Sequence, residues 1–474
     1  MNGLVDFSKY KKMETQSFYR MKGKVVNVIG LTIESAGPDA KLGDICLIYP
    51  KRKDSSISSE HDDQIKPAMA EVVGFKNNYV QLMPYENVSG IGCGSIVENT
   101  ETPLKINVGD GLLGETLDGF GRVDGTNFGQ GVKLEDGMAY SVENQPPDPM
   151  TRDLISEVLP LGVKAVDGLI TIGKGQRVGI FAGSGVGKST LLGMFARNTA
   201  ADINVIALIG ERGREVREFI ERDLGEEGMK RSVVVVATSD KPALERVKAA
   251  KTATSIAEYF RDKGKDVLLM MDSLTRFSMA QREIGLASGE PPISRGYPPS
   301  VYAEMPKLLE RAGRARQGSI TGLYTVLVNG DDFNEPITDA ARSILDGHIV
   351  LSRNLAQRNH YPAIDILQSI SRCMSSIASA EQKKAAGKLK NVLATYNEAE
   401  DLINIGAYRT GANKNIDFAI EKIDQINEFL MQETDEKMNF DTIVSKMEDI
   451  FVDESDKQTD SDDETAAPDE NGQA

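Results

Sequence analysis

Cysteine and histidine are scarce in this chain of 474 residues, with three of each. The cysteines are Cys46, Cys93 and Cys373. They lie too far apart in sequence to form a disulfide framework or a metal knuckle, so we interpret them as small packed side chains. The histidines are His61, His348 and His360. Their spacing matches no metal-ligand pattern.

Long apolar runs are also missing. No segment approaches the roughly 18 to 20 apolar residues that a helix needs to cross a membrane. Residues 1–17 lack the apolar centre of a secretory signal. We therefore expect a cytoplasmic protein.

Positive charge is in deficit, and the formal net charge is −16. Residues 453–474 hold nine acidic residues against one lysine, so about half of the net charge lies in this tail. The rest of the chain is only mildly acidic. Nucleic-acid binding needs a basic surface, so we expect no nucleic-acid partner.

The chain is predicted to be a multi-domain α/β protein. Short β-branched runs separated by Gly, Pro and Asn are typical of a small barrel. After residue 151, apolar strands alternate with helical segments, which indicates a mainly parallel sheet covered by helices. The predicted parts are an N-terminal arm at 1–17, a β-barrel at 18–95, a P-loop domain at 96–375 with a connector at 96–150, a helical C-terminal domain at 376–450, and a disordered acidic tail at 451–474.

Residues 182–189, AGSGVGKS, lie between the apolar stretches RVGIF and TLLGMF. This pattern predicts a strand, a glycine-rich loop and a helix, which together cradle nucleotide phosphates. Ala182 occupies the position of the first glycine in the usual motif. Alanine is acceptable there if the backbone at this position has a negative φ angle. Lys188 is expected to reach the β- and γ-phosphates of ATP, and Ser189 to bind Mg²⁺. The predicted nucleotide-binding residues here are Gly183, Ser184, Gly185, Val186, Gly187, Lys188, Ser189 and Thr190.

Two acidic residues follow apolar strands and complete a candidate hydrolytic site. Asp272 ends the run DVLLMMD, so we expect it at the carboxyl edge of the sheet as the Mg²⁺-side carboxylate. Glu211 follows another strand and precedes a helix, so it can orient or deprotonate the attacking water at the same edge. The structural alternatives are a helix cap for Asp272 and a surface acid for Glu211.

These motifs resemble those of the flagellar protein-export ATPases and their virulence type III secretion relatives. The resemblance to the catalytic subunit of rotary ATP synthases is more distant. Besides AGSGVGKST, the matching segments are IGERGREVREF, LLMMDSLTRF, PPISRGYPPSVYAEMPKLLERAG and DGHIVLSRNLAQRNHYPAIDILQSISR. The resemblance covers about 20–440 and implies a RecA-like P-loop ATPase domain between a β-barrel and a helical domain.

The resemblance assigns roles to four more residues. Tyr361 matches the aromatic residue that stacks on adenine, although the residues alone also fit an ordinary core tyrosine. Arg372 matches the arginine finger that enters the neighbouring subunit's site, although by itself it is typical of a surface arginine. Arg212 and Arg276 match supporting arginines beside the site. The implied catalytic residues are Lys188, Glu211 and Arg372.

The resemblance also implies a function, which is Mg-ATP hydrolysis by a homohexameric ring that energises or regulates type III export for flagellar assembly. The implied partners are a stator-like regulatory protein at the N-terminal arm, a central stalk protein, export chaperone–substrate complexes and the membrane proteins of the export gate. The implied location is peripheral, at the cytoplasmic face of the membrane. In the arm, apolar residues recur at roughly helical intervals, which fits either a docking helix or a frayed terminus. These residues are Phe7, Tyr10 and Met13 in the arm and Phe18 directly after it.

Three other functions are weighed against this one. A virulence-type secretion ATPase has nearly the same motifs. A hexameric RNA-translocating helicase requires aromatic and basic residues interleaved on the barrel, and residues 18–95 show no such cluster. A non-catalytic ring subunit does not explain Glu211. The role of the acidic tail and that of Cys373, beside the finger, do not follow from the sequence.

Overall fold

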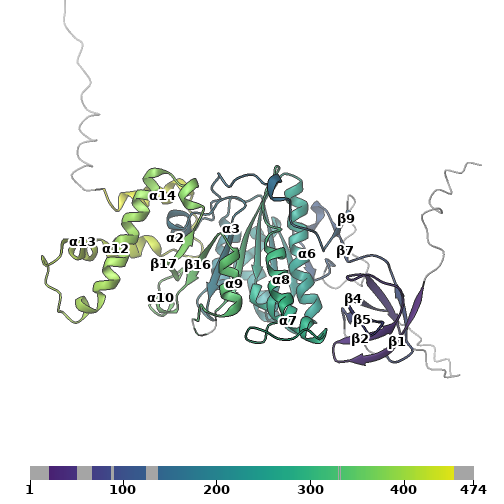
Figure 1. Ribbon diagram of the computed structural model, residues 1–474. Helices are drawn as coiled ribbons and strands as arrows, with labels where there is room; N and C mark the ends of the chain where they lie inside the picture. Colours follow the sequence, from purple (N-terminus) through teal and green to yellow (C-terminus); the bar gives the residue numbers. More distant parts are fainter. Residues whose placement is uncertain are drawn as a thin grey trace, which may run out of the picture.

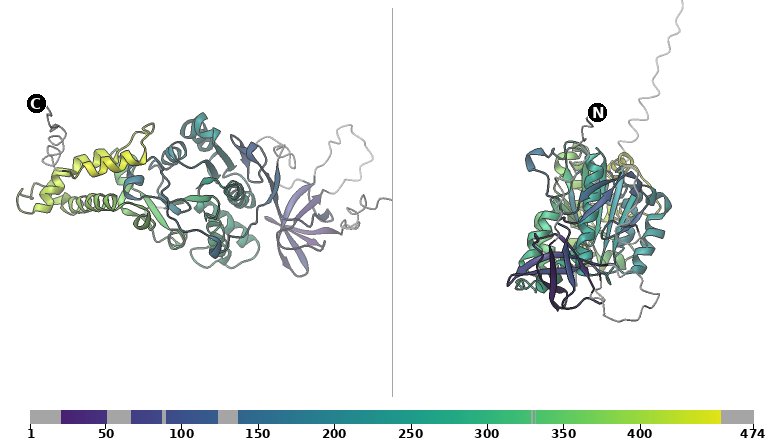
Figure 2. Two further views of the ribbon diagram at one scale, coloured as in Figure 1. Left: turned by 90° about the horizontal axis from the view of Figure 1, so that it is seen from above. Right: turned by 90° about the vertical axis from the view of Figure 1, so that its right-hand side faces the viewer.

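The computed structural model describes residues 21–50, 67–86, 90–123, 137–328, 330 and 332–452. They form three parts in a row, with a β-barrel at one end, a sheet covered by helices in the middle and a group of helices at the other end (Figure 1). The view from above in Figure 2 shows the same elongated order. The predicted arm and the tail from residue 453 lie outside the described residues.

A closed barrel forms the N-terminal part, with strand order β1-β2-β5-β4-β3-β6. Its interior holds Val25, Ile33, Ile48 and Leu82, because alternate residues of each strand point inward. The closing strand β6 begins at Ile96, so the barrel extends beyond the predicted segment 18–95. The strands are β1 (Lys22–Ile29), β2 (Thr32–Ala36), β3 (Ile45–Tyr49), β4 (Ala68–Lys76), β5 (Tyr79–Pro84) and β6 (Ile96–Asn99).

The central sheet has strand order β17-β16-β10-β15-β13-β11-β12-β8, and the short strand β14 pairs with β15. From β16 to β8 the neighbouring strands are parallel, whereas β17 is antiparallel to β16. This confirms the predicted mainly parallel sheet. Its strands are β8 (Thr116–Asp118), β10 (Arg177–Ala182), β11 (Ile203–Ile209), β12 (Ser232–Ala237), β13 (Asp266–Asp272), β14 (Gly313–Arg314), β15 (Ser319–Leu327), β16 (Gly347–Leu351) and β17 (Ile364–Ser371).

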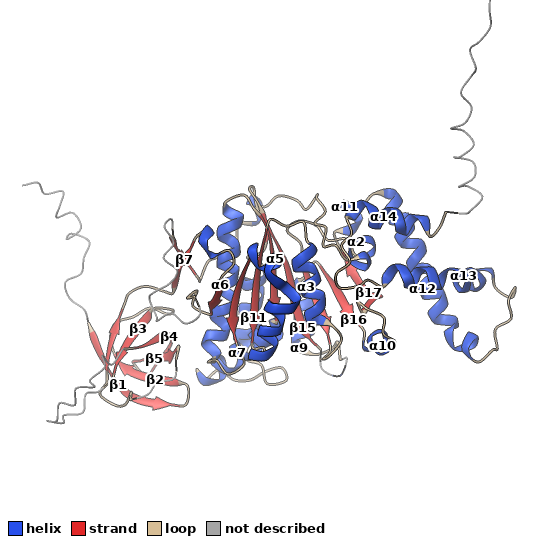
Figure 3. Cartoon of the chain, turned by 180° about the vertical axis from the view of Figure 1, so that it is seen from behind, coloured by secondary structure: helices blue, strands red, loops and turns tan. Residues whose placement is uncertain are grey.

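Both faces of the sheet are buried, which explains why its strands are almost continuously apolar. In β11, Val205 and Ala207 belong to the core on one face, and Ile206 and Leu208 to the core on the other. Helices α6 to α9 cover the first face (Figure 1), and α3 and α5 cover the second (Figure 3). The helices of this part are α2 (Lys164–Leu169), α3 (Lys188–Asn198), α4 (Gly213–Glu218), α5 (Gly225–Lys230), α6 (Ala243–Asp262), α7 (Leu274–Ala287), α8 (Pro299–Leu309), α9 (Pro336–Ile344) and α10 (Arg353–Gln357).

The C-terminal part is helical, as predicted. Its helices are α11 (Met374–Ile377), α12 (Ala380–Asn404), α13 (Lys414–Leu430) and α14 (Phe440–Asp449). Phe429 of α13 and Met447 of α14 pack around Gly168 of α2, which joins these helices to the central domain. Within the described ranges, no helix is long and apolar enough to span a membrane.

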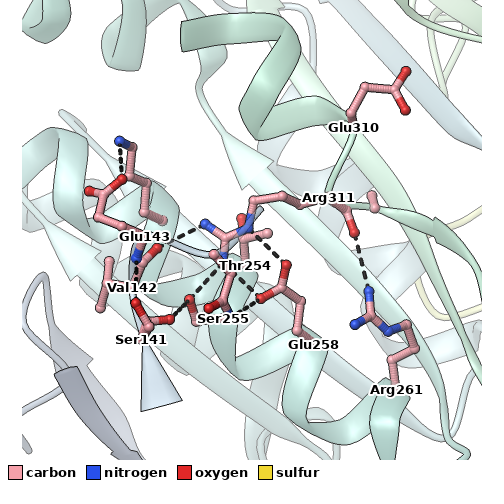
Figure 4. Close-up of polar contacts among 12 residues, drawn as sticks. Ser141, Val142, Glu143, Thr254, Ser255, Glu258, Arg261, Glu310 and Arg311 are labelled. Atoms are coloured by element: carbon pink, nitrogen blue, oxygen red, sulfur yellow. Dashed lines mark hydrogen bonds and ion pairs between the residues drawn. The ribbon is translucent and has the colours of Figure 1, made fainter. Parts of the chain in front are cut away.

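A buried arginine fixes the connector between the barrel and the central sheet. The connector contains strands β7 (Lys105–Val108) and β9 (Met138–Ser141), which pair with each other. Arg311, just after α8, lies 2.8 Å from Glu258 of α6 and donates hydrogen bonds to the backbone oxygen of Val142 and to Ser255 (Figure 4). Both charged side chains are at most 3% exposed. The pair therefore ties the connector to the helices on one face of the sheet.

Candidate active site

The glycine-rich loop leaves the sheet at β10 and leads directly into α3. Gly185 and Gly187 have φ angles of 78° and 86°, which favour glycine because it has no β-carbon. Ala182 is the last residue of β10, where the extended backbone suits any residue. Lys188 begins α3, so Ser189 lies in the first turn of the helix, where free backbone N–H groups favour an anion.

Lys188 and the two predicted carboxylates meet at this edge of the sheet. The Nζ atom of Lys188 lies 2.5 Å from Oδ1 of Asp272 and 3.5 Å from Oε1 of Glu211. Asp272 ends β13 and Glu211 follows β11, and these strands are parallel neighbours, so their carboxyl ends lie together. The Asp272 side chain is 5% exposed and that of Glu211 is 16% exposed. Three charged residues from separate motifs therefore form one cluster.

The cluster shifts the proton affinities of its members. Burial, the largest cause, and the charge of Asp272 together raise the pKa of Glu211 to about 7, although the charge of Lys188 opposes the shift. Burial lowers the pKa of Lys188, but the charges of Asp272 and Glu211 outweigh burial and raise it above its ordinary value. Lys188 is thus a cation at neutral pH, whereas Glu211 can accept and release a proton near pH 7, as a general base must.

The two supporting arginines occupy different environments. Gly210, with a φ angle of 68°, directly precedes Glu211, and a β-carbon built on it would lie 2.9 Å from Cβ of Arg276. Arg276, in α7, therefore packs against the backbone that carries Glu211. Arg212 is 81% exposed and lies 3.3 Å from Glu215. The structure brings Arg276 to the cluster and leaves Arg212 at the surface.

Tyr361 lies beside the phosphate loop, on the segment between α10 and β17. A β-carbon built on Gly187 would lie 3.4 Å from Cε1 of the Tyr361 ring. The residue is 41% exposed, so it does not occupy a core position. A partly exposed ring at this place offers a surface on which a nucleotide base can stack.

Arg372 lies away from the phosphate loop of its own chain. Leu351 of β16 is opposite Ala182, and Ser371 of β17 is opposite Gly347. The start of β16 is four residues from its end, so Ser371 lies about 13 Å along the sheet from the phosphate loop. Arg372 is exposed at this far end of the sheet, away from the nucleotide site of its own chain.

Cys373, next to Arg372, is half-buried, and burial raises the pKa of its thiol to about 11. The thiol is therefore protonated at neutral pH. The interpretation of the cysteines as packed side chains fits the buried Cys46 and the half-buried Cys373, but it is wrong for Cys93, which is exposed.

Two polar residues at the site are not predicted from the sequence. Thr325 of β15 is fully buried, and its hydroxyl lies 2.7 Å from Oδ1 of Asp272. Gln432, after α13, bonds through its side chain to the backbones of Gly162 and Lys164, and its own N–H donates to the backbone oxygen of Tyr361. The sequence gives one weak signal, a hydroxyl residue inside the apolar strand LYTVLV. Gln432 belongs to no motif.

The oxygen donors near Lys188 fit a Mg²⁺ ion. They are the carboxylates of Asp272 and Glu211 and the hydroxyl of Ser189, and Mg²⁺ prefers oxygen ligands of this kind. Across the described part of the chain, no group of three or more His, Cys, Asp or Glu side chains could hold a metal ion by itself. This suits Mg²⁺ in nucleotide sites, where substrate phosphates and one or two carboxylates share the ion.

A phosphate loop at the centre of a parallel sheet, with two carboxylates on neighbouring strands, defines a P-loop ATPase. Residues 162–371 match the nucleotide-binding domain of the ATP synthase alpha/beta family, and residues 25–101 match the β-barrel domain of that family. Residues 378–449 match the T3SS EscN ATPase C-terminal domain. Each of the three parts of the molecule therefore matches a family model.

Relatives that align with about 90% of this chain show to which group of P-loop ATPases it belongs. The flagellum-specific ATP synthase of Bacillus subtilis is 56% identical over 90% of this chain and 94% of the relative. The type 3 secretion system ATPase of Xanthomonas euvesicatoria is 51% identical over 91% of this chain and 95% of the relative. The structure of the assembled ATPase EscN of the enteropathogenic E. coli type III secretion system has a TM-score of 0.82 and 47% identity, covering 90% of this chain and 99% of EscN. The chain belongs to the family of flagellum-specific and type 3 secretion system ATPases, and its activity is ATP hydrolysis.

Proposed function

We propose that this chain is the Mg-ATP-hydrolysing ring ATPase that energises or regulates type III protein export for flagellar assembly. The observation that carries the proposal is the contact of Lys188 with both Asp272 and Glu211 at the carboxyl edge of the sheet. The 56% identity to the flagellum-specific protein of B. subtilis supports the flagellar system. The 51% identity to the X. euvesicatoria protein makes virulence-type secretion the second candidate.

In the proposed reaction, water attacks the γ-phosphorus of ATP, and the bond from that phosphorus to the β–γ bridging oxygen breaks to release ADP. Glu211 orients the water and accepts its proton. Lys188 and the backbone N–H groups of the loop hold the β- and γ-phosphates and offset their charge. Ser189 and Asp272 hold Mg²⁺, which neutralises charge on the phosphate oxygens when it is bound.

The remaining site residues act on the base and on the transferring phosphoryl group. Tyr361 stacks on adenine, and Arg276 supports the position of Glu211. Arg372 serves as the finger for the neighbouring copy, a role worth about 10³ to 10⁵ in rate. Its location at the far end of the sheet supports action in trans, and identical copies that each supply both parts form a closed homohexamer.

The proposed partners follow the family. The structure of EscN in complex with its central stalk EscO, 47% identical to this chain with a TM-score of 0.81, supports a central stalk protein. The other proposed partners are a stator-like protein at the N-terminal arm, export chaperone–substrate complexes and export gate membrane proteins. The proposed location is the cytoplasmic face of the export apparatus.

Hydrolysis by the purified chain tests the proposal. Mg²⁺-dependent ATP turnover is measured over a wide protein concentration range, with and without single-stranded RNA. The variants are Glu211→Gln, Arg372→Ala and, as a control, Arg409→Ala, which removes an exposed arginine of the C-terminal part. We expect activity per chain to rise with concentration, to ignore RNA, and to be lost in the first two variants only. Activity that is independent of concentration and of Arg372 contradicts the ring, and strong RNA stimulation favours the helicase.

A cellular assay separates the two export systems. The chain is expressed in a flagellated bacterium that lacks its own export ATPase. We expect swimming to return with the wild-type chain and not with Glu211→Gln. Rescue of virulence-type secretion without rescue of swimming favours the second candidate.

A further inference from the structure

Thr325 places a hydroxyl group at a fully buried position of strand β15, between the apolar residues Tyr324 and Val326. The Oγ1 atom of Thr325 lies 2.7 Å from Oδ1 of Asp272 and 3.3 Å from the backbone oxygen of Met271. A hydroxyl has one proton to donate, and the carboxylate oxygen is both the closer and the stronger acceptor. The hydrogen bond therefore goes to Asp272.

The strand order makes this contact possible. Strands β13 and β15 are parallel neighbours, with Met271 opposite Tyr324, so Thr325 is level with Asp272. Lys188 approaches the same carboxylate oxygen, at 2.5 Å. Two donors on Oδ1 restrict rotation of the carboxylate and leave Oδ2 for other partners.

Packing alone does not explain the hydroxyl. A β-branched side chain suits this strand, but valine has the same branching and nearly the same size as threonine. A buried hydroxyl costs free energy unless it is hydrogen-bonded, and here its bond is to a charged group of the site. Valine would therefore fill position 325 equally well, so the contact with Asp272 explains why a threonine is present.

We infer that Thr325 is a positioning residue that holds the Asp272 carboxylate in the orientation needed to bind Mg²⁺ together with the nucleotide. The inference rests on the proposed function, which assigns Asp272 to the metal. Hydrogen-bond partners of metal-ligating carboxylates act in this way in other metal sites, where their removal costs about 10- to 100-fold in metal affinity or activity.

Two variants at this position separate the hydroxyl from the packing. Thr325→Val removes the hydroxyl at nearly constant volume, and Thr325→Ser keeps it. The affinity of the full chain for a fluorescent ADP is measured in EDTA and during a Mg²⁺ titration, with the melting temperature as a check of folding. For Thr325→Val we expect unchanged affinity in EDTA and a rise of about 10- to 100-fold in the Mg²⁺ concentration that half-saturates the response. Thr325→Ser should stay within about threefold of the wild-type chain, since its hydroxyl remains.

The results distinguish failure of the inference about Thr325 from failure of the proposed function. A folded Thr325→Val variant with the wild-type Mg²⁺ response overturns the inference, and so do equal losses in the valine and serine variants. If the valine variant does not fold, Thr325→Cys replaces it, because a thiol is a weak donor, and a smaller shift in the same direction is expected. A wild-type chain whose ADP affinity ignores Mg²⁺ contradicts the metal role of Asp272, and with it the proposed function.

Discussion

Among single residues, Glu211 links the geometry of the site most directly to measurable kinetics. Its pKa of about 7 is raised by burial and by the charge of Asp272, so its carboxylate loses the ability to accept a proton below neutral pH. We expect kcat/KM to fall about tenfold per pH unit below pH 7, since this parameter reports the free enzyme. A pH series of initial rates measures it.

Glu211→Gln is the matched variant for this profile. Its amide cannot accept the proton, so we expect a loss of about 10²- to 10⁴-fold and no acidic limb at pH 7. ADP affinity should change little, because the loop and Lys188 remain. An acidic limb that persists in Glu211→Gln assigns the titration to another group.

Asp167 of α2 is a second buried acid, and its charge affects folding rather than chemistry. Its carboxylate accepts hydrogen bonds from the N–H groups of Leu161 and Gly162, yet burial outweighs them and raises its pKa from 3.8 to about 7. The folded chain therefore keeps a proton that the unfolded chain releases above pH 4. Stability from this group is complete below about pH 4 and is lost as the pH rises to 7, by on the order of 4 kcal/mol.

Asp167→Asn tests this linkage, because asparagine cannot ionise. The variant loses one of the two backbone hydrogen bonds and is expected to melt below the wild-type chain at pH 5. At pH 8 the gap should narrow or reverse, because only the wild-type chain then carries the cost of a buried charge. A gap in melting temperature that is the same at both pH values contradicts the assignment.

Among the secondary-structure elements, the connector and helices α6 and α8 depend on the buried pair of Arg311 and Glu258. Arg311→Met leaves Glu258 charged and unpaired, so we expect a loss of about 3 to 5 kcal/mol of stability in urea unfolding. The double variant Arg311→Met/Glu258→Leu removes both charges and should recover most of this loss. Arg214→Met, which breaks an exposed pair with Glu218 in α4, is the control and should cost at most about 1 kcal/mol. Equal losses for the buried and exposed pairs would show that burial is not the cause.

The elements also show which features the sequence could predict. The phosphate loop, Asp272 and Glu211 follow from local patterns, because each lies where an apolar strand ends. Thr325 could not be assigned in this way, since its role depends on β13 and β15 being neighbours although about 50 residues separate them. The closing barrel strand β6 was missed for a similar reason, because its partners β1 and β3 are distant in sequence.

For the whole molecule, the prediction concerns assembly. On the proposed roles, a complete site combines Glu211 of one chain with Arg372 of the next. Two inactive variants, Glu211→Gln and Arg372→Ala, should therefore regain activity when mixed, because about a quarter of the interfaces in random rings pair an intact Glu211 with an intact Arg372. The rate of ATP hydrolysis is measured against the mixing ratio, and the maximum is expected near equal amounts.

Each variant alone, at the same total concentration, is the control for the mixture. A mixture that merely averages the two residual rates contradicts a shared site. It would place the finger function within a single chain, against the position of Arg372 at the far end of the sheet.

The separation of Arg372 from the phosphate loop along one sheet also gives the molecule a polarity. On the proposed role of Arg372, in a row of copies that has not closed, the nucleotide site of the first chain receives no Arg372 from a neighbour, and the Arg372 of the last chain enters no neighbouring site. Two chains thus share one working site, each further chain adds one, and closure adds the last without adding a chain. The rate of ATP turnover per chain therefore rises as the row lengthens. A molecule that binds one end of the row leaves growth at the other end possible but prevents ring closure, so the last site is never completed.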